Sequence, residues 1–522
     1  MTPTLSMLLG TNDCPSSHQY GALLTSKGKV EDALHEIDMI MTHLEHGRRQ
    51  LQDIHQSHRS VMSPIRRLPV EILARIFALS TCSFYDVFDP HLKDGPWTLS
   101  KVCSGWRVVA TRCCPKMWKN MNIACKVAPR DPEALLRLVF SQCRDDPLHI
   151  RIGEIGEALI ALLPIIMEES RRWRTFEVSY PNPKLVDVLQ TVQGKLDILE
   201  SLRLHMPNDA GQTLTRTFEV APKLTRVELM NRKGEMQISL PFSQLLTYID
   251  DSYPRVAGMS SAEYFLNILK KSPRLFKFHA GRYLWFLGQH TIVHPAVVPP
   301  IVHESLEELS SYDPALLRSV LLPKLKVLKM ETPDGKYSLR TPLLALCELI
   351  INSNCSLTSL TLRNVALGGW KDVLVLTPCL TTLEVVMRHA FGAYTAGFLS
   401  GLVGGLAERG KDPEDSSQYV IVPLLNNLTI EVADTSGDSI IYYGFFNRDF
   451  VDMVASRYHS AALQHIRVVA QSNGPNEGID FWRFGSDEFR WMEKLRSDGL
   501  KISVFEEIGQ GREPIKHLVT EE

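Results

Sequence analysis

Two pairs of histidines in this chain of 522 residues have a spacing at which both imidazoles could bind one metal ion. His43 and His46, and again His55 and His58, are three positions apart and would share one face of a helix. Zinc sites in proteins need three or four ligands. No cysteine or carboxylate stands at a recognised spacing from either pair. We therefore expect solvated polar positions here, and no metal site.

The recognised catalytic motifs are also incomplete. His35-Glu36 and His303-Glu304 begin like a zinc-protease motif, but no second histidine completes either one. A glycine-rich stretch from Gly401 lacks the order of a phosphate-binding or dinucleotide-binding loop, and the sequence contains no nucleophile elbow. A triad of residues distant in the chain would not be visible, so an enzyme with an unrecognised active site is kept as the least favoured alternative. We expect a non-catalytic chain without a cofactor.

Composition restricts the partners and the compartment. The 57 basic and 59 acidic residues give a net charge of −2, whereas a nucleic-acid-binding protein usually shows a marked excess of basic residues. The ten cysteines include no Cys-x-x-Cys and are expected to be reduced thiols. The apolar run at the N-terminus is too short for a signal peptide, and no stretch approaches the roughly 18 apolar residues of a membrane helix. We expect a cytoplasmic or nuclear protein with no nucleic-acid or membrane partner.

The N-terminal region divides into two predicted segments. Residues 1–28 are rich in Thr, Ser, Gly and Pro without a clear period and are expected to be disordered. Residues 29–62 are predicted to form a helical arm, which Ser63-Pro64 ends. Its apolar seam comprises Val30, Leu34, Ile37, Met41, Leu44 and Leu51, and it is interrupted at Arg48, His55 and His58. The arm could fold back onto the following segment, or residues 30–58 could form a partial coiled coil and associate weakly with a second copy.

Two further amphipathic helices are predicted between Ile65 and Trp118. Leu68-Pro69 opens the first helix, because proline is tolerated in a first turn, and Glu71 suits the positive end of the helix dipole. Its apolar stripe comprises Ile72, Leu73, Ile76 and Phe77. The stripe of the second helix comprises Leu99, Val102, Cys103, Trp106 and Val109.

The order Leu-Pro-x-Glu-Ile-Leu, Ile-Phe, Val-Cys-x-x-Trp-Arg and Met-Trp in this region resembles the F-box, the helical module by which substrate receptors bind the Skp adaptor of SCF-type ubiquitin ligases. One departure is the lengthened connection from Cys82 to Trp97, which fungal-type F-box proteins often carry. The resemblance implies an all-α F-box over residues 63–124. It also implies the residues that contact the adaptor: Leu68, Pro69, Ile72, Ile76, Val102 and Trp106.

The long region from residue 126 to 508 repeats the phrase Leu-x-x-Leu-x-Leu, with variants. The ten copies span 173–178, 199–204, 224–229, 275–278, 306–309, 325–330, 357–362, 380–385, 425–430 and 463–468. The first residues of the first three copies are 26 and 25 positions apart, which is within the period of leucine-rich repeats. Prolines such as Pro222, Pro273 and Pro323 precede many copies and would end a helix before each strand.

This region resembles the irregular leucine-rich repeats of many F-box receptors. The fold class is therefore expected to be mixed α/β: a helical arm and an F-box, followed by a solenoid with a curved parallel sheet. The Asn or Cys at the ninth repeat position is missing, since Pro207, Pro333 and Val365 stand there. Residues 509–522 are expected to form a loose tail, and a non-solenoid α/β domain remains the alternative.

Residues between the buried leucines would line the concave face of such a solenoid. The candidates for contact with a target are Arg203, His205, Lys329, Glu331, Arg363 and Glu384. Their signs alternate, which indicates neither a phosphopeptide site nor a nucleic-acid groove. Aromatic segments at 283–288 and 442–446 could supply interface anchors or core, and Phe481 to Phe484 with Trp491 could cap the last repeat.

Together these features predict a substrate-recognition subunit of an SCF-type ubiquitin ligase. The F-box would bind the Skp adaptor, and through it a cullin, while the repeats would hold a protein target whose identity the sequence does not indicate. The alternative is a Skp-bound scaffold without ligase activity, which the same sequence features would produce.

Overall fold

The computed structural model describes most of the chain in two compact units. The described residues are 3–11, 13–80, 83–89, 95–124, 130–153, 160–179, 183–206, 216–231, 238–251, 260–281, 300–331, 342–365, 368–387, 392–410, 419–434, 447–460, 463–472, 486–508 and 511–514. The first unit comprises Met1–Ser80 with Val108–Cys114, and the second comprises Thr81–Arg107 with Pro115–Glu522.

Two helices form the N-terminal part of the first unit, where the sequence predicts disorder as far as residue 28. Helix α1 spans Pro3–Thr11 and helix α2 spans Ser17–Val61. Helix α2 begins at Ser17 because Ser16 and Gln19 form a capping box, in which each side chain accepts a hydrogen bond from the other residue's backbone N–H. The prediction of disorder for 1–28 was therefore wrong over these helices, and it overlooked the Ser-x-x-Gln signal.

The first unit continues with the short helix η1, Pro64–Arg67, and helix α3, Val70–Ser80. Leu73 and Phe77 on α3 are buried, and the helix packs against the π-helical turn η2, Val109–Cys113, whose Val109 and Ala110 are buried too. The thiol of Cys114 donates a hydrogen bond to the carbonyl oxygen of Ala74 at 3.3 Å. One apolar face of α3 thus lies in the core of this unit.

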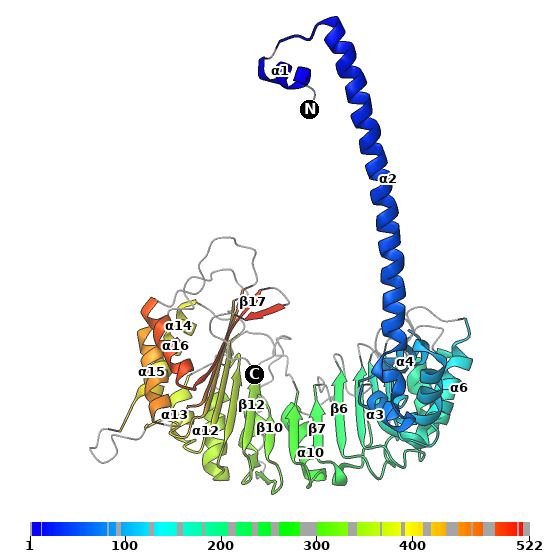
Figure 1. Cartoon of the computed structure of the whole chain (residues 1–522). Helices are drawn as coiled ribbons and strands as arrows, with labels where there is room; N and C mark the ends of the chain where they lie inside the picture. Colours follow the sequence, from blue (N-terminus) through cyan, green and yellow to red (C-terminus); the bar gives the residue numbers. More distant parts are fainter. Residues whose placement is uncertain are drawn as a thin grey trace. The chain divides into compact units, whose positions relative to one another are not determined.

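The second unit contains one open sheet whose strands follow the order of the chain (Figure 1). Every neighbouring pair is parallel except the last, which is antiparallel. Its strands are β1 Tyr85–Asp86, β2 Asn120–Ile123, β3 Leu148–Ile152, β4 Trp173–Ser179, β5 Ser201–Met206, β6 Arg226–Asn231, β7 Thr247–Asp250, β8 Lys277–Ala280, β10 Glu308–Ser310, β12 Val327–Glu331, β13 Ser359–Arg363, β14 Thr382–Met387, β15 Asn427–Asp434, β16 His465–Ser472, β17 Lys501–Ile508 and β18 Gly511–Pro514. Strands β9, Ile301–Val302, and β11, Val320–Leu321, form a separate pair.

Helices connect many of these strands, and Figure 1 shows α12 to α16 along one face of the sheet. The helices of this unit are α4 Pro96–Val102, α5 Ser104–Val108, α6 Pro132–Gln142, α8 Leu163–Glu168, α9 Pro183–Leu189, α10 Ser261–Lys271, α11 Pro314–Arg318, α12 Pro342–Ser353, α13 Trp370–Val375, α14 Gly392–Ala407, α15 Arg448–His459 and α16 Ser486–Ser497. Short 3₁₀ turns lie at Pro115–Met117, Ser170–Arg172, Gln190–Val192 and Phe242–Gln244.

All ten predicted repeat copies overlap a strand of this sheet, so the mixed α/β class and the parallel strands are confirmed. Their second apolar positions, together with Tyr248 of β7, align in register across the sheet, and each of these residues is 1% exposed or less. This column comprises Phe176, Leu202, Val227, Tyr248, Phe278, Leu309, Leu328, Leu360, Leu383, Leu428 and Ile466. Each repeat copy thus buries its apolar residues beside those of the neighbouring copy in the sheet. Of the ninth-position residues, Val365 is buried, while Pro207 and Pro333 lie outside the described residues.

The sheet begins earlier than residue 126, inside the region expected to be an all-α F-box. Strands β1 and β2 both lie within 63–124 and pair with each other, and β2 pairs with β3. Tyr85 of β1 donates a hydrogen bond to the carbonyl oxygen of Trp118 at 2.9 Å, and Trp97 packs edge-on against Trp118 at 4.9 Å. The lengthened connection therefore supplies the first strand and its aromatic packing, and the expectation of an all-α module was wrong.

The C-terminal end of the sheet also differs from expectation. Residues 509–522 were predicted to be a loose tail, but Gly511–Pro514 forms β18 and pairs antiparallel with β17. A short antiparallel edge strand ending at proline covers an edge that would otherwise present unpaired backbone groups.

Candidate interaction surfaces

Helix α3 carries apolar side chains on a second face that is exposed. Ile72 is 47% exposed and Ile76 is 40% exposed, whereas Leu73 and Phe77, one position further along in each case, are 6% and 1% exposed. Pro69 is exposed and Leu68 is partly buried at the start of the helix. Four predicted adaptor contacts in this segment of the first unit are therefore exposed or partly exposed.

Leu79 extends the same face by three positions beyond Ile76, and it is 70% exposed. Leu79 is not among the contacts predicted from the sequence. Its spacing of seven from Ile72 is the signal that would have identified it, because residues seven apart lie on one helical face. We define the outer face of α3 as Ile72, Ile76 and Leu79 on the helix together with Leu68 and Pro69, which precede it.

The other two predicted contacts, Val102 and Trp106, belong to the second unit. Val102 is 57% exposed and Trp106 is partly buried. One helix was predicted through both residues, but the structure has two, because Cys103 adopts an extended backbone with φ −160° between α4 and α5. The Cys103 sulfur accepts a hydrogen bond from the Trp106 backbone N–H at 3.4 Å and so satisfies a donor in the first turn of α5.

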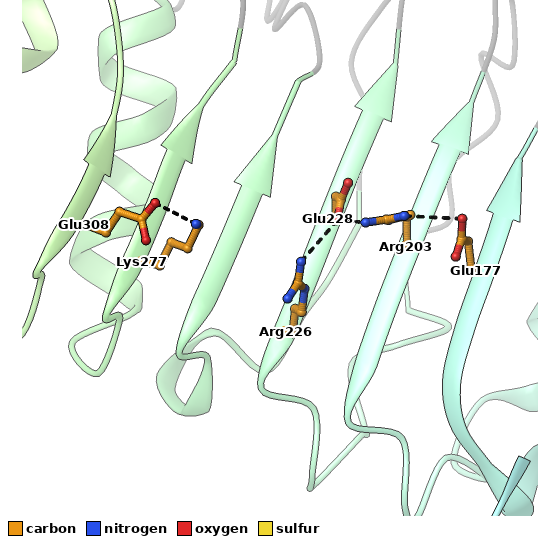
Figure 2. A network of polar contacts seen from close by, with 6 residues as sticks. All are labelled: Glu177, Arg203, Arg226, Glu228, Lys277 and Glu308. Carbon is orange, nitrogen blue, oxygen red and sulfur yellow. Dashed lines mark hydrogen bonds and ion pairs between the residues drawn. The ribbon is translucent and has the colours of Figure 1, made fainter. Parts of the chain in front are cut away.

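The exposed side of the sheet carries a ladder of ion pairs across its first strands. Arg151, Glu177, Arg203 and Glu228 occupy the same register position on β3, β4, β5 and β6. Arg203 lies 3.4 Å from Glu177 and 2.6 Å from Glu228, so its guanidinium connects three strands (Figure 2). Arg151 lies 3.0 Å from Glu177, and Arg226 lies 3.7 Å from Glu228.

These charged side chains stabilise one another at partly buried positions. The side chains of Glu177 and Glu228 are each 19% exposed. Burial opposes the charge on Arg203, but its hydrogen bonds to Glu228 and Glu177 and their negative charges outweigh burial and raise the pKa of Arg203 above its ordinary value. The ladder is therefore a fixed network rather than a set of free charges.

A second cluster lies further along the sheet. Glu308 on β10 lies 2.6 Å from Lys277 on β8 and 3.2 Å from Lys329 on β12 (the Lys277 pair is drawn in Figure 2). Burial alone would raise the pKa of Glu308, but the hydrogen bonds and charges of Lys277 and Lys329 lower it below its ordinary value. Lys329, a predicted target contact, is thus engaged with its neighbour.

A third cluster joins the remaining charged candidates. Arg363 on β13 lies 3.8 Å from Glu331 on β12 and 3.3 Å from Glu384 on β14. The Thr361 hydroxyl also donates to Glu384 at 3.2 Å. The structure therefore brings Glu331, Arg363 and Glu384 together.

The other two charged candidates, Arg203 and Lys329, lie in separate clusters, and His205 on β5 lies beside Ser179 and Met230 in register. Glu177 and Glu308 were not among the candidates predicted from the sequence. Glu177 occupies the same repeat position as Arg203, so aligning the copies by that position would have identified it. Glu308 pairs in register with Lys277 and Val327, at a repeat position from which no candidate was predicted.

Several aromatic candidates lie outside the described residues, namely 283–288, 442–446 and 481–484. Trp491 on α16 is described and 40% exposed, and the cationic groups of Arg448 and Lys494 lie 5.3 and 5.2 Å from its ring centroid. Trp491 was considered as part of a cap on the last repeat. In the structure it is partly exposed and forms a cation–π cluster at the surface.

In the described parts of the chain, no three His, Cys, Asp or Glu side chains converge on a possible metal position. Over the same residues, no helix combines the length and the apolar character needed to cross a bilayer.

The sequence matches no protein-family model and no curated protein.

Proposed function

We propose that this chain is the substrate-recognition subunit of an SCF-type ubiquitin ligase and binds a Skp-type adaptor through the outer face of α3. The proposal depends on one observation. A helix whose Leu73 and Phe77 already fill its own core leaves Ile72, Ile76 and Leu79 in solvent. Exposed apolar stripes of this kind are typical of docking surfaces. The order of residues that resembles an F-box supports the choice of adaptor.

The adaptor interface is tested by one substitution with a matched control on the same helix. Ile76→Asp adds a carboxylate to the outer face, and Ala78→Asp adds one at another exposed position of α3. We expect Ile76→Asp to weaken adaptor binding by at least about tenfold, because burying a carboxylate in an apolar contact costs more than about 1.4 kcal/mol, and Ala78→Asp to change it little. Co-expression with a Skp adaptor and titration of the purified complex measure both. Equal affinities for the two variants would contradict the proposed face.

Val102 and Trp106 are tested separately, since they belong to the second unit. If they take part in the interface as the resemblance implies, Val102→Asp also weakens adaptor binding while the neighbouring exposed Lys101→Asp does not. If Val102→Asp binds normally, the interface is restricted to the outer face of α3.

A receptor speeds ubiquitin transfer by holding its target near a charged enzyme at raised local concentration. Supplied with ubiquitin and a ubiquitin-charged enzyme, the purified chain with the adaptor and a cullin should therefore assemble a complex that transfers ubiquitin. Binding of the adaptor without recruitment of the cullin would instead favour a scaffold without ligase activity.

The exposed side of the sheet is the surface that we propose for a protein target. Each of its three ion-pair clusters contains both signs of charge, so a target would be recognised by alternating rather than single-sign charge. Arg363→Glu would place three carboxylates together in the third cluster and should remove proximity-labelled proteins that accumulate when the proteasome is inhibited. An unchanged set of labelled proteins would exclude this part of the sheet as the target site.

A further inference from the structure

The apolar seam of helix α2 is not buried by the described residues of its own unit. None of the residues of α2 is buried, although the helix is 45 residues long and is described throughout. At 1.5 Å per residue it extends roughly 65–70 Å. Val30, Ile37 and Leu44, on one side of it, are 57%, 52% and 65% exposed. A helix of this length with an unburied seam requires a partner to cover it.

The seam is longer than the sequence analysis indicated, because α2 begins at Ser17. Alternating steps of three and four residues run from Tyr20 to His58, which is the heptad spacing of a coiled coil. The seam positions are Tyr20, Leu23, Lys27, Val30, Leu34, Ile37, Met41, Leu44, Arg48, Leu51, His55 and His58. Each heptad has two seam positions. The one occupied by Leu23, Val30, Ile37, Leu44 and Leu51 is apolar in every heptad.

We infer that this seam binds the same seam of a second copy of the chain, and that the two α2 helices are parallel and in register. Eight apolar seam residues on each copy, at roughly 100 Å² each, would bury about 800 Å² per partner. That is the area per partner of a standard stable interface. Lys27, the first charge in the seam, lies 3.4 Å from Glu31 of its own helix.

The flanking charges favour the parallel orientation. Glu31, Asp38 and Glu45 each follow a seam residue by one position and lie on one flank. In an antiparallel pair this acidic flank would face the same acidic flank of the second copy. In a parallel pair it faces the opposite flank of the partner, where Ser26, Ala33 and Ile40 carry no charge. Like charges directly opposed are unfavourable, so the parallel pair is preferred.

Gly47 supplies an independent indication. Glycine inside a helix costs about 1 kcal/mol relative to alanine, and a Cβ at this position would meet nothing within 4 Å in the chain itself. Gly47 lies in a shallow groove bordered by Leu44, Arg48, Leu51 and His55, which are all seam positions. A hole between seam residues is where the knob of a partner helix inserts, and the missing side chain gives room for Arg48 of that partner.

The number of chains is tested by light scattering of the purified full-length chain. We expect a mass of twice 59.0 kDa. Ile37→Glu with Leu44→Glu should give the mass of one chain, because two charges enter the seam of each copy. The control, His35→Glu with Thr42→Glu, has the same spacing on an exposed face away from the seam and should keep the double mass. Circular dichroism should show equal helix content for both variants.

The orientation is tested by oxidation of single-cysteine substitutions, with the crosslinked peptides identified by mass. In a parallel, in-register pair, Val30→Cys and Leu51→Cys each form a disulfide with the same residue of the partner. In an antiparallel pair aligned over the same span, neither forms its own disulfide, and only a mixture of the two variants crosslinks. A mass of one or three chains for the wild type, dissociation of the control variant, or crosslinks only in the mixture would overturn the inference. Adaptor binding takes no part in any of these measurements.

Discussion

The guanidinium of Arg457 donates a hydrogen bond from Nε to the carbonyl oxygen of Leu406 at 2.8 Å, across 51 positions of the chain. Its other nitrogens donate to the carbonyl oxygens of Val422 and Ile421 at 2.9 and 2.7 Å, and the side chain is 0% exposed. Burial lowers the pKa of Arg457 to about 10. Arg457 also lies 4.2 Å from the ring centroid of Tyr419. One buried guanidinium thus supplies hydrogen-bond donors to carbonyl oxygens at the end of α14 and in the segment that precedes β15.

Replacement of Arg457 should therefore be costly. Arg457→Leu removes three hydrogen bonds to buried carbonyl oxygens, of which that of Val422 keeps another donor, the Leu425 backbone N–H. We expect a loss of about 2–4 kcal/mol in the free energy of unfolding. Arg457→Lys should recover only part, because a single ammonium lacks the planar fork that reaches all three. Denaturant unfolding measures both. The exposed Arg448→Leu on the same helix is the control, expected to change stability by less than about 1 kcal/mol. An equally small loss for Arg457→Leu would show that these bonds contribute little.

Adjacent glycines in α14 should respond in opposite directions to alanine. A Cβ on Gly405 would lie 2.7 Å from Cη2 of Trp370, whereas one on Gly404 would meet nothing within 4 Å. We expect Gly405→Ala to destabilise by about 1–3 kcal/mol through overpacking. Gly404→Ala should stabilise by up to about 1 kcal/mol through helix propensity. Thermal unfolding of the two variants decides this, and equal shifts would argue against tight packing of Trp370 on α14.

The second ion-pair cluster predicts a pH dependence of stability. Lys277 and Lys329 hold the folded-state pKa of Glu308 below its ordinary value of 4.5, so the folded state binds the proton less well than the unfolded chain. The stabilisation is then complete above pH 4.5 and is lost as the pH falls through the lower folded-state value. Unfolding of wild type and Glu308→Gln should differ by about 1 kcal/mol or less at neutral pH, with the gap closing in acid. For the control Glu304→Gln, at an exposed position, the difference in unfolding free energy from wild type should not change in this way. A difference between wild type and Glu308→Gln that grows in acid would contradict the direction assigned to the pKa of Glu308.

A buried carboxylate on β7 gives a further prediction. Asp250 is 0% exposed and accepts hydrogen bonds from the Tyr248 hydroxyl at 2.9 Å and the Tyr264 hydroxyl at 3.2 Å. Burial, with the charge of Asp250, raises the pKa of Tyr248 well above its ordinary value, so this hydroxyl remains a donor. Tyr248→Phe should cost about 1–3 kcal/mol. Tyr264→Phe, at the longer and less buried contact, should cost less. The reverse order in chemical unfolding would show that Tyr264 is the principal donor.

Periodicity in the sequence was sufficient to predict ten strands of the sheet and their parallel stacking. Strand β7 shows the limit of that signal, since Tyr248 and Asp250 occupy positions where the repeat phrase has leucine. Asp250 is tolerated there because two tyrosine hydroxyls hydrogen-bond to it, and Tyr264 lies on α10, in another element. A single-residue pattern does not contain that information.

Local sequence also determined which residues on α3 are apolar, and the capping box at Ser16 determined where α2 begins. Only the tertiary structure decided which apolar residues are core and which are surface, because Leu73 and Ile72 are chemically alike and differ in what packs against them. The ion-pair clusters have the same origin: Glu177, Arg203 and Glu228 are about 25 residues apart in the chain and become neighbours only through strand register. The sequence specifies the type of each side chain. Which side chains are buried and which charges form ion pairs depends on segments that folding brings together.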